Sequence, residues 1–182
     1  MANMCDFEMR VAGRRVDIAA FFDAMEQRGK YIMGRGASAD IYYDDDEPTT
    51  KATIYGYCKW SVMSALVDNA IDMRKHPENW CWPGSDERDD DCEYITLFEA
   101  CRKWNLDMEV YSAESGCCFQ EHYMIEDGTL TCEDCVDYYE YYIGDYETIE
   151  EAEAELDTDI TNEEWLEGEF ITRGGFDWEF SI

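Results

Sequence analysis

Between Trp104 and Thr172 the sequence contains 22 Asp and Glu residues and no Lys or Arg. The whole chain of 182 residues has a formal net charge of −30, whereas a magnitude of about 2 to 8 is enough to keep a small domain soluble. High net charge with low hydrophobicity is typical of disordered chains. Here, however, 46% of the residues are apolar and 15% are aromatic, including six Trp and thirteen Tyr. We therefore expect a folded domain with a charged surface.

The charge limits the partners that the protein can bind. A strongly anionic surface repels nucleic acid and anionic membranes, and it attracts basic proteins through long-range steering. The first partner to consider is a basic nucleic-acid-binding protein. The sequence has no run of roughly 20 apolar residues and no apolar signal-peptide region near its N-terminus, so we expect a cytoplasmic protein.

The hydrophobic pattern predicts alternating strands and helices in the first hundred residues. Met4 to Val11 alternates as a half-buried strand does, and Asp17 to Gly29 has the three- and four-residue apolar spacing of a helix. The other predicted elements are strands at Asp40–Tyr43 and Ala52–Trp60, a helix from Ser61 to just before Pro77, an irregular loop at Pro77–Glu93 and a helix at Ile95–Trp104.

The remaining sequence predicts an antiparallel meander followed by an acidic segment. Its strands are expected at Met108–Tyr111, Cys117–Ile125 and Leu130–Tyr142. Thr148 to Asp159 fits a short helix, and Thr161 or Asn162 is a suitable cap for another. The alternation of Phe176, Trp178 and Phe180 predicts a closing strand that docks its aromatic side. The sequence thus favours one α+β domain over residues 1–143 and an acidic C-terminal extension over 144–182, docked on that domain.

Three segments carry a resemblance to a known family. They are Met1 to Phe7, Tyr57 to Ser61, and the stretch Leu97 to Gly128 with its Tyr111 to Phe119 hairpin. Together they resemble the YubB-like family of phage domains. The resemblance implies a ferredoxin-like antiparallel sheet with helices packed on one face, and a phage or mobile-element origin. It implies no activity.

In length and acidity the whole chain also resembles phage type II-A anti-CRISPR proteins. This resemblance implies inhibition of a type II CRISPR endonuclease with its guide RNA inside a bacterial host cell, by blocking target DNA binding or cleavage. Such an enzyme holds nucleic acid in a positively charged channel. Acidic DNA mimicry, in which carboxylates replace the spaced phosphates, would compete for that channel. An acidic inhibitor of another basic host DNA-binding protein remains an alternative.

Three acidic runs are the candidate partner-binding residues. A run of acids is also typical of a solvated face or loop. The runs are Asp44, Asp45, Asp46 and Glu47; Asp89, Asp90 and Asp91; and Glu150, Glu151, Glu153 and Glu155.

The nine cysteines suggest reduced thiols or metal ligands more than a disulfide framework. Cys132 and Cys135 form a CxxC, and Cys117 and His122 lie in the neighbouring predicted hairpin. Thiolates and imidazole are zinc ligands, so structural zinc in a regulatory module of a mobile element is the second alternative. A redox role is weaker because no βαβ context surrounds the CxxC.

No pattern indicates an enzyme. Carboxylate pairs occur throughout an acidic chain and cannot single out acid and base groups. Gly34 to Gly36 is only a fragment of a dinucleotide-binding fingerprint. We expect a protein that acts by stoichiometric binding and needs no cofactor for that role.

Overall fold

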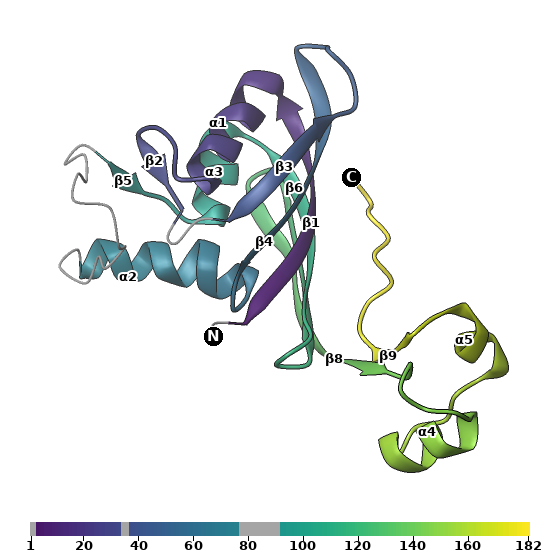
Figure 1. Cartoon of the computed structure of the whole chain (residues 1–182). Helices are drawn as coiled ribbons and strands as arrows, with labels where there is room; N and C mark the ends of the chain where they lie inside the picture. Colours follow the sequence, from purple (N-terminus) through teal and green to yellow (C-terminus); the bar gives the residue numbers. More distant parts are fainter. Residues whose placement is uncertain (1–2, 34–36, 77–91) are drawn as a thin grey trace.

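The structure is a computed structural model that describes residues 3–33, 37–76 and 92–182. It has an α+β architecture built on a seven-stranded antiparallel sheet, in the order β3-β4-β1-β6-β7-β8-β9 (Figure 1). The strands of this sheet are β1 (Met4–Arg14), β3 (Ser38–Tyr43), β4 (Thr49–Lys59), β6 (Asp107–Glu114), β7 (Phe119–Glu126), β8 (Thr129–Tyr142) and β9 (Phe170–Gly174).

A second, two-stranded parallel sheet pairs β2 (Tyr31–Ile32) with β5 (Glu93–Tyr94). The helices are α1 (Arg15–Met25), the π-helical turn η1 (Ser64–Asp68), α2 (Asn69–Lys75), α3 (Leu97–Trp104), α4 (Ile149–Leu156) and α5 (Asn162–Glu167). No helix among the described residues is long and apolar enough to cross a membrane.

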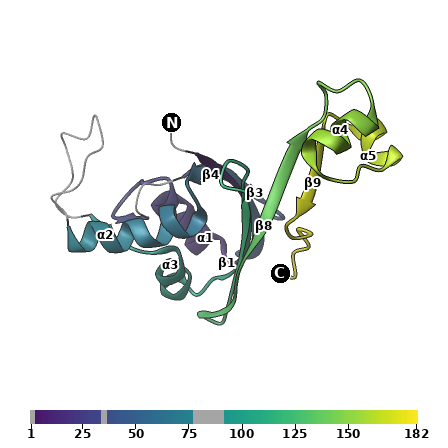
Figure 2. The same ribbon diagram turned by 90° about the horizontal axis from the view of Figure 1, so that it is seen from below.

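The main core lies between one face of the sheet and helix α1, the turn η1 and helix α3, whereas the buried residues of α2 pack in a small separate cluster with Tyr94 (Figures 1 and 2). The alternation in β1 turns Phe7, Met9 and Val11 inward, and each is at most 3% exposed. Met9 stands opposite Ile54 of β4 and Val110 of β6, so β1 is the centre of this core. The period-2 pattern therefore decides which face of β1 the helices cover.

The C-terminal lobe, residues 143–174, has a second and smaller core. β8 extends beyond the helix-covered sheet and pairs with β9, and α4 and α5 lie in the connection between the two strands (Figure 1). The buried side chains of the lobe are Ile143, Ala152, Ile160 and Ile171. Thr148 caps α4 and Thr161 caps α5, each accepting a hydrogen bond from a backbone N–H of the first turn.

The C-terminal tail, residues 175–182, returns along the sheet face opposite the helices (Figure 2). Phe176, Trp178 and Phe180 are half-buried and alternate with exposed residues. The predicted docking of these rings is confirmed, but the predicted strand is wrong, because this segment is extended without pairing in the sheet. Gly174 and Gly175, with φ of 72° and 81°, turn the chain out of the sheet after β9.

Most predicted elements are present, with shifted ends. Helix α1 ends at Met25 instead of Gly29, and Gln27 then adopts a left-handed φ of 61°. β9 and the β2–β5 pair were not predicted. The expected loop at Pro77–Glu93 lies largely outside the described residues, and its last residue belongs to β5.

Candidate functional site

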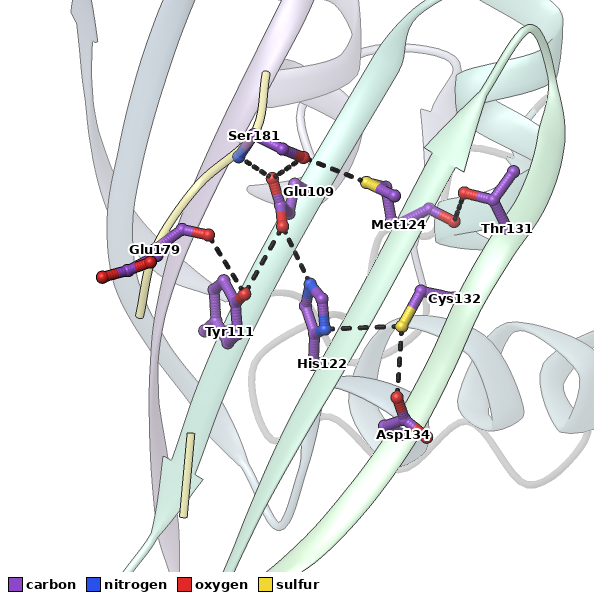
Figure 3. A network of polar contacts seen from close by, with 9 residues as sticks. All are labelled: Glu109, Tyr111, His122, Met124, Thr131, Cys132, Asp134, Glu179 and Ser181. Carbon is purple, nitrogen blue, oxygen red and sulfur yellow. Dashed lines mark hydrogen bonds and ion pairs between the residues drawn. The ribbon is translucent and has the colours of Figure 1, made fainter. Parts of the chain in front are cut away.

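The sheet face opposite the helices carries a polar network beneath the tail. In β6, Glu109 and Tyr111 project to this face, and His122 of β7 stands opposite Tyr111. β8 adds Cys132 and Asp134, which are two residues apart and so share a face. These side chains form a continuous set of contacts (Figure 3).

Glu109 connects the sheet to the tail. Its side chain is 3% exposed and accepts hydrogen bonds from the backbone N–H of Ser181 at 2.6 Å and from the Ser181 hydroxyl at 2.9 Å. The Nε2 atom of His122 lies 2.9 Å from the same carboxylate. Burial raises the pKa of Glu109, but the hydrogen bonds from Ser181 and His122 outweigh burial, so the net pKa lies below its usual value.

The His122 ring is held between aromatic side chains. It stacks in parallel on Tyr111 with ring centroids 4.0 Å apart, and the edge of Phe176 packs at 5.7 Å. Tyr111 also contacts the rings of Trp178 and Phe180. Burial, helped by the charge of Glu109, raises the pKa of Tyr111 to about 12, so this phenol stays neutral. The histidine is thus fixed by both packing and hydrogen bonding.

The other ring nitrogen of His122 faces a thiol. Its Nδ1 atom lies 3.4 Å from Sγ of Cys132, and that sulfur lies 3.4 Å from Oδ2 of Asp134. Cys132, His122 and Glu109 place a thiol, an imidazole and a carboxylate in the order found in cysteine nucleophile sites. Here burial and the carboxylate of Asp134 raise the pKa of Cys132, whereas an activated nucleophile needs a lowered thiol pKa.

Among the described residues, His122, Cys132 and Asp134 form the group whose ligand atoms lie within 4.8 Å of one another and so could hold a metal ion. The four ligands suggested by the sequence are not brought together. Cys135 stands opposite Glu121, on the other face of β8 from Cys132. Cys117 lies exposed between β6 and β7, 3.2 Å from Nδ2 of Asn3. A CxxC within a strand cannot form a zinc knuckle, because its two side chains point to opposite faces.

The acidic run at Asp44–Glu47 lies in the exposed connection between β3 and β4. It is partly neutralised, because Arg15 forms an ion pair with Asp46 at 3.4 Å and donates to the backbone carbonyl of Asp45. Figure 1 shows this connection far from α4. The two acidic runs therefore do not form one continuous patch.

The run on α4 has two kinds of carboxylate. Glu151 accepts from the backbone N–H of Glu147, and Glu153 accepts from that of Ile160, so both support the local fold. Glu150 and Glu155 are exposed. Asp89, Asp90 and Asp91 lie outside the described residues.

Some carboxylates of the stretch without Lys or Arg are buried instead of lying on the surface. Glu121 is 4% exposed and accepts from the backbone N–H of Val62, from Ser112 and from Tyr123 at 2.8–2.9 Å. Neutral N–H and O–H donors, instead of Lys or Arg side chains, satisfy this buried carboxylate. The sequence predicted a charged surface, but some of the carboxylates are instead buried and hydrogen-bonded inside the fold.

Sequence reasoning missed Glu109 and Asp134. The signal for Asp134 was present, because Cys132 and Asp134 alternate within a predicted strand. Glu109 had no such signal, since its role depends on the tail returning from residue 181. Comparisons of the chain with protein families, with curated proteins and with solved structures found no match.

Proposed function

We propose that this protein is an acidic inhibitor that binds a basic nucleic-acid-binding protein, with β8 and the C-terminal lobe as the binding surface. One observation carries the proposal. Between Thr129 and Glu169 thirteen of the carboxylate side chains that the structure describes are exposed, and the sequence has no Lys or Arg in that range. They are Glu133, Asp134, Asp137, Glu140, Asp145, Glu147, Glu150, Glu151, Glu155, Asp157, Asp159, Glu163 and Glu169.

The cation that follows this range is engaged inside the lobe. Arg173 pairs with Glu164 through both of its terminal nitrogens, at 2.6 and 3.3 Å. It also donates to the side chain of Thr158 and to the backbone carbonyl of Asp159. Arg173 therefore does not neutralise the exposed carboxylates, and their negative potential can act on a partner.

The same region exposes apolar side chains. Leu166 is 83% exposed and Phe170 is 55% exposed, and the ring of Phe170 packs 5.0 Å from that of Tyr142. Aromatic anchors within a charged surface are typical of protein interfaces, where a few such residues provide most of the binding energy. Carboxylates would steer the encounter, and the apolar side chains would hold the complex.

The resemblance to phage type II-A anti-CRISPR proteins selects a type II CRISPR endonuclease as the target. Its guide duplex and displaced DNA strand run along basic surfaces. The lobe would occupy one of these surfaces and block DNA binding or cleavage. The sheet order β3-β4-β1-β6 supports a ferredoxin-like unit in the first part of the chain, since it is the order of a β-α-β-β-α-β motif with antiparallel neighbours. An experimental structure with β1 at a sheet edge would contradict that fold assignment.

The test measures DNA binding and cleavage by the guide-loaded endonuclease while the protein is titrated at two salt concentrations. We expect stoichiometric inhibition that weakens at the higher salt, because screening shortens the reach of exposed charges. A lobe variant carries Glu150→Gln, Glu155→Gln, Glu163→Gln and Glu169→Gln, all at exposed positions. Its control carries Asp40→Asn, Asp44→Asn, Asp46→Asn and Glu47→Gln.

The two variants have the same net charge, so only the position of the removed carboxylates differs. We expect the lobe variant to lose at least tenfold in inhibition and the control to remain within about twofold of the wild type. Equal losses would show that only total charge matters. Absence of binding to the endonuclease by the wild type would reject this target and direct the search to other basic host proteins.

A further inference from the structure

We propose that His122, Cys132 and Asp134 form a zinc site with three protein ligands and one position open to solvent. The zinc proposal does not rest on the proposed inhibition, although Asp134 is also one of the exposed carboxylates of β8 in the acidic binding surface. The site also differs from the CxxC site suggested by the sequence, since it includes Asp134 and excludes Cys135 and Cys117.

The distances between the ligand atoms suit a tetrahedral ion. With Zn–S near 2.3 Å and Zn–N near 2.0 Å, a tetrahedral zinc ion separates its sulfur and nitrogen ligands by about 3.5 Å. Sγ of Cys132 lies 3.4 Å from Nδ1 of His122 and 3.4 Å from Oδ2 of Asp134. All three ligand atoms lie within 4.8 Å of one another, so zinc binding requires only small side-chain adjustments.

Glu109 prepares the histidine for a metal. When Nε2–H of His122 donates to Glu109, Nδ1 keeps its lone pair free and directed toward Cys132 (Figure 3). Metal-binding histidines commonly donate their other ring nitrogen to a carboxylate, which fixes the tautomer and the ring. Stacking on Tyr111 restrains the ring further.

The donor set distinguishes zinc from the hard cations that an acidic protein attracts. Mg²⁺ and Ca²⁺ prefer oxygen ligands, whereas thiolate and imidazole favour zinc and similar soft ions. On binding, the Cys132 thiol would release its proton to solvent and the sulfur would ligate the ion. The exposed side chain of Asp134 lies on the solvent side of the cluster, so water supplies the fourth ligand.

The site also connects to the tail. Glu109 bonds His122 on one side and both the backbone N–H and the hydroxyl of Ser181 on the other. A metal on Nδ1 makes the His122 N–H a stronger donor to Glu109 and orders this carboxylate. We therefore expect zinc to hold the tail more firmly on the sheet.

The first experiment measures zinc bound to the full-length protein, stripped of metal, after dialysis against micromolar zinc with millimolar Mg²⁺. The excess Mg²⁺ occupies nonspecific carboxylates. We expect about one zinc per chain for the wild type and for Cys135→Ser, and less than a tenth of that for Cys132→Ser and His122→Asn. Glu109→Gln should weaken the affinity about 10- to 100-fold.

Cys132→Ser and Cys135→Ser make a matched pair within one CxxC. The proposal is overturned if the wild type binds no zinc, or if both variants still bind it. Loss of zinc in both variants also overturns it, and supports a CxxC site instead. Circular dichroism of each apo variant identifies any that fails to fold. Cobalt substitution adds a second readout, since a thiolate–cobalt absorption band in the near ultraviolet should appear in Cys135→Ser and be absent from Cys132→Ser.

Hydrogen exchange tests the connection to the tail. Zinc should slow exchange of the Ser181 amide in the wild type and leave it unchanged in Cys132→Ser. Unchanged exchange of the Ser181 amide in the zinc-loaded wild type overturns the connection to the tail but leaves the site itself in place.

Discussion

The helix-covered sheet and the C-terminal lobe differ in how many cations they contain and in how large a core they bury. All Lys and Arg residues except Arg173 lie in the first 103 positions, and the large core there is built from closely packed apolar side chains. The lobe has four buried side chains and one engaged cation. A strongly acidic region can therefore fold on a small core when helix caps and one arginine satisfy its polar groups. Its stability should be correspondingly low.

Replacing Phe21 should give the largest effect. Phe21 is fully buried in the main core, and Phe→Ala substitutions at such sites cost about 3–5 kcal/mol. We expect Phe21→Ala to lower the free energy of unfolding of the whole sheet by that amount in urea denaturation. A loss confined to the lobe would contradict the assignment of Phe21 to the main core.

Ile143→Ala is the matching change in the lobe. Ile143 is 2% exposed within a cluster of four buried residues, so we expect a loss of about 2–3 kcal/mol. Hydrogen exchange should accelerate in residues 143–174, while amides of β1 and β6 keep their protection. Equal acceleration in β1 would mean that the two regions unfold as one unit.

Arg173→Met tests the single cation of the lobe. Removing its hydrogen bonds to Glu164 should cost the lobe about 1–2 kcal/mol at pH 7. The hydrogen bond from Arg173 lowers the pKa of Glu164 to about 2, below its usual value of about 4.3. A depressed carboxyl pKa stabilises the fold above the unfolded value and loses that contribution as pH falls.

The difference between wild type and Arg173→Met should therefore be largest above about pH 5 and shrink between about pH 4 and pH 2. Exchange rates of lobe amides over this pH range measure it. A difference that stays constant down to pH 2 would show that Arg173 acts through packing and not through its charge.

We expect the smallest effect from removing a helix cap, and the same capping motif occurs in the helix-covered sheet and in the lobe. Thr96 begins α3 and Thr161 begins α5, each with a glutamate three residues later that completes a capping box. Alanine at a cap costs about 0.5–2 kcal/mol. We expect Thr96→Ala, at a 4% exposed position, to lower global stability by more than 1 kcal/mol. Thr161→Ala should cost less and affect only the lobe, as measured by urea denaturation with hydrogen exchange.

Local pattern was enough to predict most strands and helices. The alternation of Phe7, Met9 and Val11 in β1, and the spacing of Leu66, Ala70 and Met73 across η1 and α2, directly reflect which side chains are buried. Thr161 was predicted as a cap because capping depends on residues within one turn. The tail was predicted to dock from the spacing of its rings. These features depend only on neighbouring residues, so the sequence by itself determined them.

Tertiary structure decided what depends on distant segments. β9 pairs with β8 and leaves the tail unpaired, so alternation in the tail produced docking without a strand. The CxxC suggested a metal knuckle, but the register of β7 against β8 instead places Asp134 opposite His122. Glu109 acquires two of its partners, His122 and Ser181, from positions 13 and 72 residues away. The physical reason is that a hydrogen bond depends on distance and direction in space, and only the folded sheet brings these groups within reach.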